Sequence, residues 1–212
     1  MNRQRTPIFD ILVLGGCFFM AKLYFRHGAM NCGKSAALMQ VAHNYNENDM
    51  GVIVIKSSTD TKADDHLQSR TGLTRKVDYL LNPKESIEPH FEKWAESAKC
   101  ILVDEAQFLS PEQVNELWIF SKIYDRPVIC YGLRTDFQSN LFEGSKRLLE
   151  VADEIEELTT ICRCGNKAHF NARFVNGSFA IEGDSILIDG SQKNVEYKPM
   201  CGKCYIKNRY GR

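Results

Sequence analysis

Residues 28–35 have the types and spacing that bind the phosphates of a nucleotide. They read G-A-M-N-C-G-K-S and match G-x-x-x-x-G-K-[ST] at every position. In such a loop the backbone N–H groups surround the phosphates, the lysine reaches the β- and γ-phosphates, and the hydroxyl binds Mg²⁺. A chance match in a glycine-containing turn is the alternative, but residues 22–26 alternate like a strand and residues 36–42 favour a helix. The predicted nucleotide-binding residues are Gly28, Ala29, Met30, Asn31, Cys32, Gly33, Lys34 and Ser35.

Two carboxylates, Asp104 and Glu105, directly follow an apolar run at residues 100–103. Ligands of open α/β sheets bind beyond the carboxyl ends of the strands, so both acids are expected beside the phosphate loop. Asp104 is predicted to hold Mg²⁺ together with Ser35. Glu105, one residue later, can face the substrate and accept a proton from an attacking hydroxyl or water. A solvated acidic turn is the alternative for any such pair, and the upstream phosphate loop argues against it.

Residues 57–75 form a polar stretch that has no clear period and is long for a connection within a compact domain. Taken alone, it is equally consistent with a solvated flexible loop. Beside a nucleotide site, we interpret it as a lid that carries a cation to the phosphates.

Eight cysteines are present, and four of them are paired by spacing near the end of the chain. Cys162 and Cys164 form a C-x-C pair, and Cys201 and Cys204 form a C-x-x-C pair. Four thiolates from two tight turns predict a closed, structural Zn²⁺ site in a reducing compartment. Separate buried thiols are the alternative. His169 is a substitute ligand in principle, but we expect it to be a strand residue only.

Basic and tyrosine residues around the second pair are better explained as a solvated tail than as a nucleic-acid surface.

The elements that must position these residues alternate between strand and helix. Buried strands are expected at 51–56, 100–103 and 127–133, and helices at 33–46, 86–98, 111–123 and 141–152. This alternation predicts an α/β fold of the P-loop (RecA-like) type, with a mostly parallel sheet covered by helices on both faces. A small β-rich zinc-ribbon domain is expected to follow it.

Length and charge set the remaining expectations. We expect residues 1–19 to be an N-terminal extension that is disordered or precedes the native start at Met20, 20–160 to be the nucleotide-binding domain, and 161–212 to be the zinc-binding domain. The 27 Lys and Arg residues equal the 27 Asp and Glu residues in number, which argues against a uniformly basic face for nucleic acid. The apolar stretch 8–20 is too short to span a bilayer comfortably. We therefore expect a cytoplasmic protein with neither nucleic-acid nor membrane partners.

Taken in order, the motifs resemble those of the zinc-containing thymidine kinases of bacteria and animal cytosol. The resemblance rests on the phosphate loop, V-D-E-A-Q-F at 103–108, Y-G-L-R-T-D-F at 131–137, I-C-R-C-G at 161–165, E-G-D-S-I-L-I-D-G at 182–190 and the terminal C-x-x-C. It implies ATP-dependent phosphorylation of the thymidine 5′-hydroxyl to give dTMP and ADP. It also implies a homotetramer that is inhibited by dTTP.

The same resemblance assigns residues. Glu105 matches the general base, Gln107 joins Asp104 in the ATP site, and Phe137 matches the aromatic ring that stacks on thymine. A loop comprising Leu187, Ile188, Asp189 and Gly190, together with Tyr197, matches the segment that grips the base. Three extra residues before Tyr197 depart from the family pattern. In the lid, Lys62 aligns with a family arginine, and Arg70 is the alternative cation.

Two other functions remain open from the residues alone. A P-loop ATPase motor would need a water-activating arrangement and a nucleic-acid face, and neither is evident in the sequence. A zinc-ribbon regulator that binds a nucleotide would need no acid beyond the magnesium ligand, so Glu105 argues against it.

Overall fold

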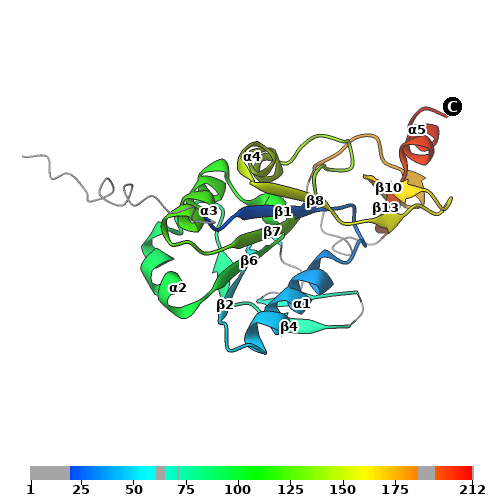
Figure 1. Cartoon of the computed structure of the whole chain (residues 1–212). Helices are drawn as coiled ribbons and strands as arrows, with labels where there is room; N and C mark the ends of the chain where they lie inside the picture. Colours follow the sequence, from blue (N-terminus) through cyan, green and yellow to red (C-terminus); the bar gives the residue numbers. More distant parts are fainter. Residues whose placement is uncertain (1–19, 61–64, 71, 186–193, 212) are drawn as a thin grey trace, which may run out of the picture.

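A six-stranded parallel sheet forms the centre of the molecule (Figure 1). The computed structural model describes residues 20–60, 65–70, 72–185 and 194–211. The predicted parallel sheet is confirmed. Its strands lie in the order β5-β2-β6-β7-β1-β8. They are β1 (Leu23–His27), β2 (Val52–Ser57), β5 (Tyr79–Leu81), β6 (Cys100–Asp104), β7 (Val128–Gly132) and β8 (Glu154–Glu157).

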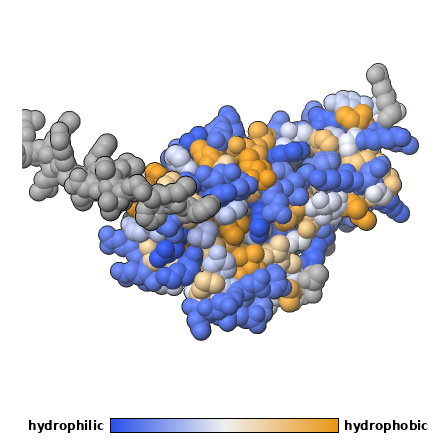
Figure 2. Space-filling model, in the orientation of Figure 1, coloured by the Kyte–Doolittle hydropathy of each residue, from blue (hydrophilic) through white to orange (hydrophobic). Residues whose placement is uncertain are grey.

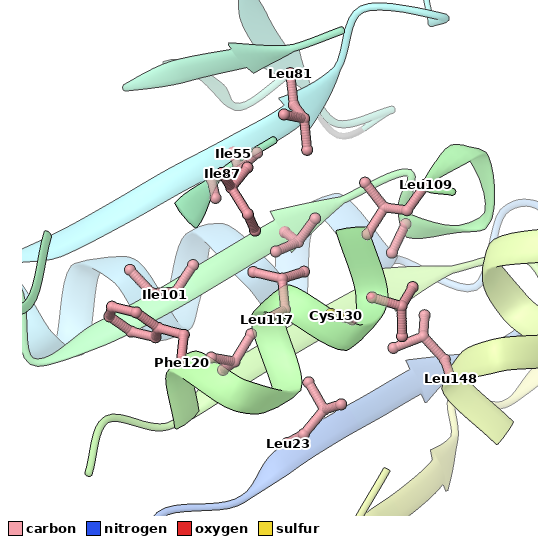
Figure 3. Close-up of a cluster of buried hydrophobic side chains, with 14 of the residues drawn as sticks. Leu23, Ile55, Leu81, Ile87, Ile101, Leu109, Leu117, Phe120, Cys130 and Leu148 are labelled. Carbon is pink, nitrogen blue, oxygen red and sulfur yellow. The ribbon is translucent and has the colours of Figure 1, made fainter. Parts of the chain in front are cut away.

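Both faces of the sheet are covered, which is why its central strands read as continuous apolar runs. The helices α2 (Phe91–Ser97), α3 (Pro111–Ile123) and α4 (Glu143–Val151) cover one face. Figure 3 shows Leu117 and Phe120 of α3 packed among Leu23, Ile101 and Cys130 of the sheet. The helix α1 (Lys34–Asn46) packs on the opposite face through a second apolar cluster.

Two local predictions are corrected by the structure. Pro89 lies inside the helix expected at 86–98, and this segment instead begins with a 3₁₀ turn (Glu88–His90) before α2. Proline lacks an N–H and restricts the residue before it, so the α-helix proper starts only after it. The stretch at 57–75 is also not wholly irregular. It contains an antiparallel hairpin of β3 (His66–Gln68) and β4 (Thr74–Lys76), whose buried Leu67 packs in the α1 cluster.

The C-terminal part is β-rich, as expected, and ends in a helix that was not. It comprises β9 (Thr160–Ile161), β10 (Lys167–Ala168), β11 (Phe170–Val175), β12 (Ser178–Phe179), β13 (Val195–Met200) and α5 (Gly202–Tyr210). The helix α5 buries Tyr205 and leaves Lys203 and Lys207 exposed to solvent. The space-filling view in Figure 2 shows a largely hydrophilic face with smaller hydrophobic patches. Within the described ranges, no helix has the length and apolar character needed to cross a membrane.

Candidate active site

The phosphate loop connects β1 to α1, and its two glycines are required by the backbone. A Cβ atom at Gly28 would lie 2.5 Å from Cys32 Sγ and 2.6 Å from the carbonyl oxygen of Leu158. Gly33 has a φ of 85° and precedes the first residue of α1. A left-handed residue at this point suits glycine and aims the N–H groups of the helix start into the loop.

Three polar side chains meet at the loop. The Lys34 ammonium is buried and donates to the carbonyl oxygen of Ala29 at 3.3 Å, so it lies over the loop. Ser35 Oγ donates to Asp104 Oδ2 at 3.0 Å, which joins the start of α1 to the end of β6. The structure thus brings together the two residues that were predicted to hold Mg²⁺.

The surroundings of Asp104 fit a divalent cation. Its Oδ1 atom is buried and has no hydrogen-bond partner within the described residues. Burial, followed by repulsion from Glu105, raises the pKa of the Asp104 carboxyl above its usual range. A cation bound beside this carboxyl group would favour its ionised form. Because Mg²⁺ prefers one or two carboxylate oxygens with other oxygen ligands, Asp104 and Ser35 suit it.

Glu105 is held by a neighbour that was assigned to the ATP site. Its backbone is left-handed, with a φ of 50°, and its Oε2 atom accepts from Gln107 Nε2 at 2.5 Å. The Oε1 atom of Gln107 accepts from the backbone N–H of Leu133 at 3.0 Å. Gln107 is itself buried, and a Cβ atom on Gly132 would lie 2.8 Å from its Oε1 atom. In the structure Gln107 therefore links the Glu105 carboxylate to the end of β7.

One cavity of about 280 Å³ is lined by both groups of predicted residues. Its lining includes five residues around the phosphate loop and the end of β6, namely Lys34, Ser35, Asp104, Glu105 and Gln107. Phe137, Tyr197 and Arg70 line it as well. Phe137 and Tyr197 pack together with Val195 in a small buried cluster. Lys62, Leu187, Ile188, Asp189 and Gly190 lie outside the described residues.

The four predicted zinc ligands also come together. The Sγ atoms of Cys162, Cys164, Cys201 and Cys204 all lie within 4.8 Å of one another, and none of these cysteines is in a disulfide. A tetrahedral site with Zn–S bonds of about 2.3 Å has sulfur–sulfur separations of about 3.8 Å, so the cluster fits zinc. His169 is not part of the cluster, because its Nδ1 atom contacts Glu157 Oε1 at 2.7 Å.

Comparison with known proteins identifies the family. The thymidine kinase family matches residues 21–205. The thymidine kinase of Enterobacteria phage T4 is 45% identical, covering 80% of this chain and 89% of that protein. The thymidine kinase of Haemophilus influenzae strain Rd is 44% identical, covering 87% of this chain and 100% of that protein. The thymidine kinase of Mannheimia succiniciproducens is 41% identical, covering 91% of this chain and 98% of that protein. This chain belongs to the thymidine kinase family. The predicted resemblance is confirmed, and the matched span includes the phosphate loop, Glu105 and all four clustered cysteines.

Two residues near the cavity of this thymidine kinase family member, Asn171 and Lys56, were not singled out from the sequence. Asn171, on β11, is buried; its Oδ1 atom accepts from Met30 N at 2.7 Å and its Nδ2 atom donates to Thr135 O at 3.0 Å. It therefore ties the C-terminal part to the phosphate loop. Lys56 is 2% exposed, lines the cavity and pairs with Asp60 at 3.2 Å. Lys56 could have been recognised from the sequence, because it is a charged residue directly after the apolar run of β2. No local pattern distinguished Asn171.

Proposed function

We propose that this protein transfers the γ-phosphoryl group of ATP to the 5′-hydroxyl of thymidine, with Glu105 as the general base. The observation that supports it best is the convergence of the phosphate loop, the Ser35–Asp104 pair and Glu105 on one cavity. Family membership supports thymidine as the acceptor.

On the donor side, the residues of the loop position and neutralise a triphosphate. The N–H groups of the loop and the N-terminus of α1 receive the phosphates, and the Lys34 ammonium reaches the β- and γ-phosphates. Ser35 and Asp104 would hold Mg²⁺, which would offset the negative charge that develops during transfer. Arg70, which lines the cavity, and Lys62 are the candidate lid cations that would complete this neutralisation.

On the acceptor side, the proposed roles are orientation and proton removal. The Glu105 carboxylate accepts the proton of the 5′-hydroxyl as that oxygen attacks the γ-phosphorus. The hydrogen bond from Gln107 holds the carboxylate in place. The ring of Phe137 stacks on thymine, and residues 187–190 with Tyr197 grip the base. Tyr197 lines the cavity beside Phe137, which supports its part in this assignment.

The remaining proposals concern the whole protein. Zinc on the four cysteines is structural, because four thiolates leave no open position for water. We further propose two domains, at 20–160 and 161–212, a homotetrameric assembly, feedback inhibition by dTTP and a cytoplasmic location. Light scattering and inhibition by dTTP at fixed ATP test the assembly and the feedback.

The release of ADP with different acceptors tests the function. We expect thymidine to stimulate ADP release strongly, and deoxycytidine or the absence of any acceptor to leave it near background. Release that is independent of an acceptor would identify an ATPase. Binding of ATP without release in any arm would identify a regulator.

The substitution Glu105→Gln tests the proposed base. Because general-base catalysis contributes typically 10²–10⁴-fold, we expect kcat to fall by about that factor while the binding of ATP and thymidine persists. Glu96→Gln, which changes an exposed carboxylate on α2, is the control and should leave kcat unchanged. An unaltered kcat in Glu105→Gln would remove Glu105 from this role.

A further inference from the structure

Arg173, on β11, is a buried cation that the proposed mechanism does not use. Its side chain is 1% exposed, and no carboxylate among the described residues forms an ion pair with it. Its guanidinium carbon lies 3.5 Å from the ring centroid of Phe137, so the guanidinium covers one face of that ring. A base that stacks on Phe137 must therefore use the opposite face.

The same guanidinium also holds a second segment of the chain. Its Nη1 atom donates to the carbonyl oxygen of Asp184 at 2.6 Å, and its Nη2 atom donates to that of Glu182 at 3.2 Å. Gly183, between them, has a φ of 124°, and a Cβ atom there would lie 2.5 Å from Nη2. The backbone of residues 182–184 thus bends closely around the Arg173 side chain. This segment leads into residues 187–190.

The chemistry of the contact suits arginine and not lysine. A planar guanidinium can stack on an aromatic face while its N–H groups diverge in the ring plane, whereas an ammonium offers a single point charge. The buried Nε atom of Arg173 has no hydrogen-bond partner within the described part of the chain. Burying a cation with an orphaned donor is unfavourable, so this arrangement is costly to the fold. Arg173 on β11 pairs directly with Tyr197 on β13, the other residue that is assigned to the binding of thymine.

We propose that Arg173 is a positioning residue for the nucleoside, which fixes the ring of Phe137 and the 182–184 segment as one unit. The inference rests on the proposed function, in which Phe137 stacks on thymine. Among the residues that the structure describes, Arg173 forms no hydrogen bond or ion pair with the phosphate loop, Asp104 or Glu105, and it does not line the cavity. Its loss should therefore weaken the binding of thymidine and leave the transfer step and the binding of ATP largely intact.

Kinetics of Arg173→Met and Arg173→Lys test this proposal. We expect the KM for thymidine to rise at least about ten-fold in Arg173→Met, since a hydrogen bond to a charged group contributes that much or more. The KM for ATP should stay within about two-fold and kcat within about three-fold, and Arg173→Lys should restore little because it cannot keep both contacts. Lys198→Met is the matched control, because Lys198 lies over the ring of Phe174 in the same small sheet but is substantially exposed.

Cleavage by a glutamate-specific protease gives a readout that does not depend on activity. If Arg173 holds the 182–184 segment, cleavage after Glu182 should be at least about five-fold faster in Arg173→Met than in Lys198→Met, because proteolysis follows local opening. If Arg173→Met fails to fold, Gly183→Ala replaces it. The added Cβ atom should push the segment off the guanidinium and raise the KM for thymidine in the same way.

The outcomes separate this inference from the proposed function. An unchanged KM for thymidine with a lowered melting temperature or kcat would make Arg173 a structural residue only and overturn the inference. So would unchanged cleavage after Glu182 in the variants. A wild-type protein that releases no ADP with thymidine would overturn the proposed function instead, while the protease measurement would still decide whether Arg173 fixes the segment.

Discussion

Glu105 occupies a left-handed backbone conformation directly after a buried strand. For a residue with a Cβ atom this conformation costs roughly 1–2 kcal/mol, and such residues persist where the surrounding structure holds them. Here the holding group is Gln107, which bonds the Glu105 carboxylate on one side and Leu133 N on the other. At the residue scale, then, Gln107 positions the proposed base.

The substitution Gln107→Met distinguishes this role from a direct contact with ATP. Methionine has a similar length but removes both hydrogen bonds. Since a hydrogen bond to a charged group is worth about 1.5–3 kcal/mol, we expect kcat to fall about ten-fold or more, with the KM for ATP within about two-fold. Gln40→Met, on the exposed side of α1, is the control. A raised KM for ATP with normal kcat would instead place Gln107 in the ATP site.

At the scale of elements, α5 connects the cysteine cluster to the cavity. The helix begins at Gly202, between the two cysteines of the second pair, so its first turn is part of the cysteine cluster. One residue after Cys204, the Tyr205 hydroxyl donates to the carbonyl oxygen of Phe137 at 2.5 Å. Through α5 and Tyr205, the cluster is therefore connected to Phe137, which lines the cavity.

Removal of zinc should accordingly weaken the binding of thymidine more than the binding of ATP. We expect Cys201→Ser to lose zinc and to raise the KM for thymidine while changing the KM for ATP far less. Metal analysis and steady-state kinetics on the same sample check this. Tyr205→Phe separates the two effects: it should keep full zinc and raise the KM for thymidine by roughly three- to ten-fold, the range for one neutral hydrogen bond. Normal kinetics in a zinc-free Cys201→Ser protein would contradict this connection.

At the scale of the whole molecule, the carboxylate of Asp153 connects three elements at the edge of the sheet where its parallel strands begin. Asp153 Oδ2 accepts from Leu23 N at 2.7 Å and from Lys122 Nζ at 2.6 Å, which joins the start of β8 to β1 and α3. Partial burial opposes ionisation of this group. The Lys122 ammonium and the backbone N–H outweigh that effect and hold the pKa of Asp153 below its usual value of 3.8.

This shift predicts how stability depends on pH. Because the pKa of Asp153 is lower in the folded state, its contribution is fully present above the unfolded value of 3.8 and is lost as the pH falls through the folded value. We expect Asp153→Asn to lower the free energy of unfolding by about 1–3 kcal/mol near pH 7. Urea titrations should show the difference shrinking as the pH falls below about 4, with Glu96→Gln as the control. A difference that stays constant over this range would show that the carboxylate charge is not what matters.

The sequence by itself determined the parts of this protein that depend on local spacing. The phosphate loop needs glycines, a lysine and a hydroxyl at fixed separations, and acids after a buried strand must lie at the carboxyl edge of a parallel sheet. For the same reason, the spacing of the paired cysteines predicted a metal site, and the structure brings their four thiols together.

Only the tertiary structure decided what joins these parts. Asn171 meets Met30 across 141 positions of the chain, and Tyr205 meets Phe137 across 68. The stacking of Arg173 on Phe137 and the packing of the hairpin through Leu67 also depend on long-range contacts. No period or spacing encodes such a contact, because it forms only when the sheet and the C-terminal strands have set the distance between two backbones.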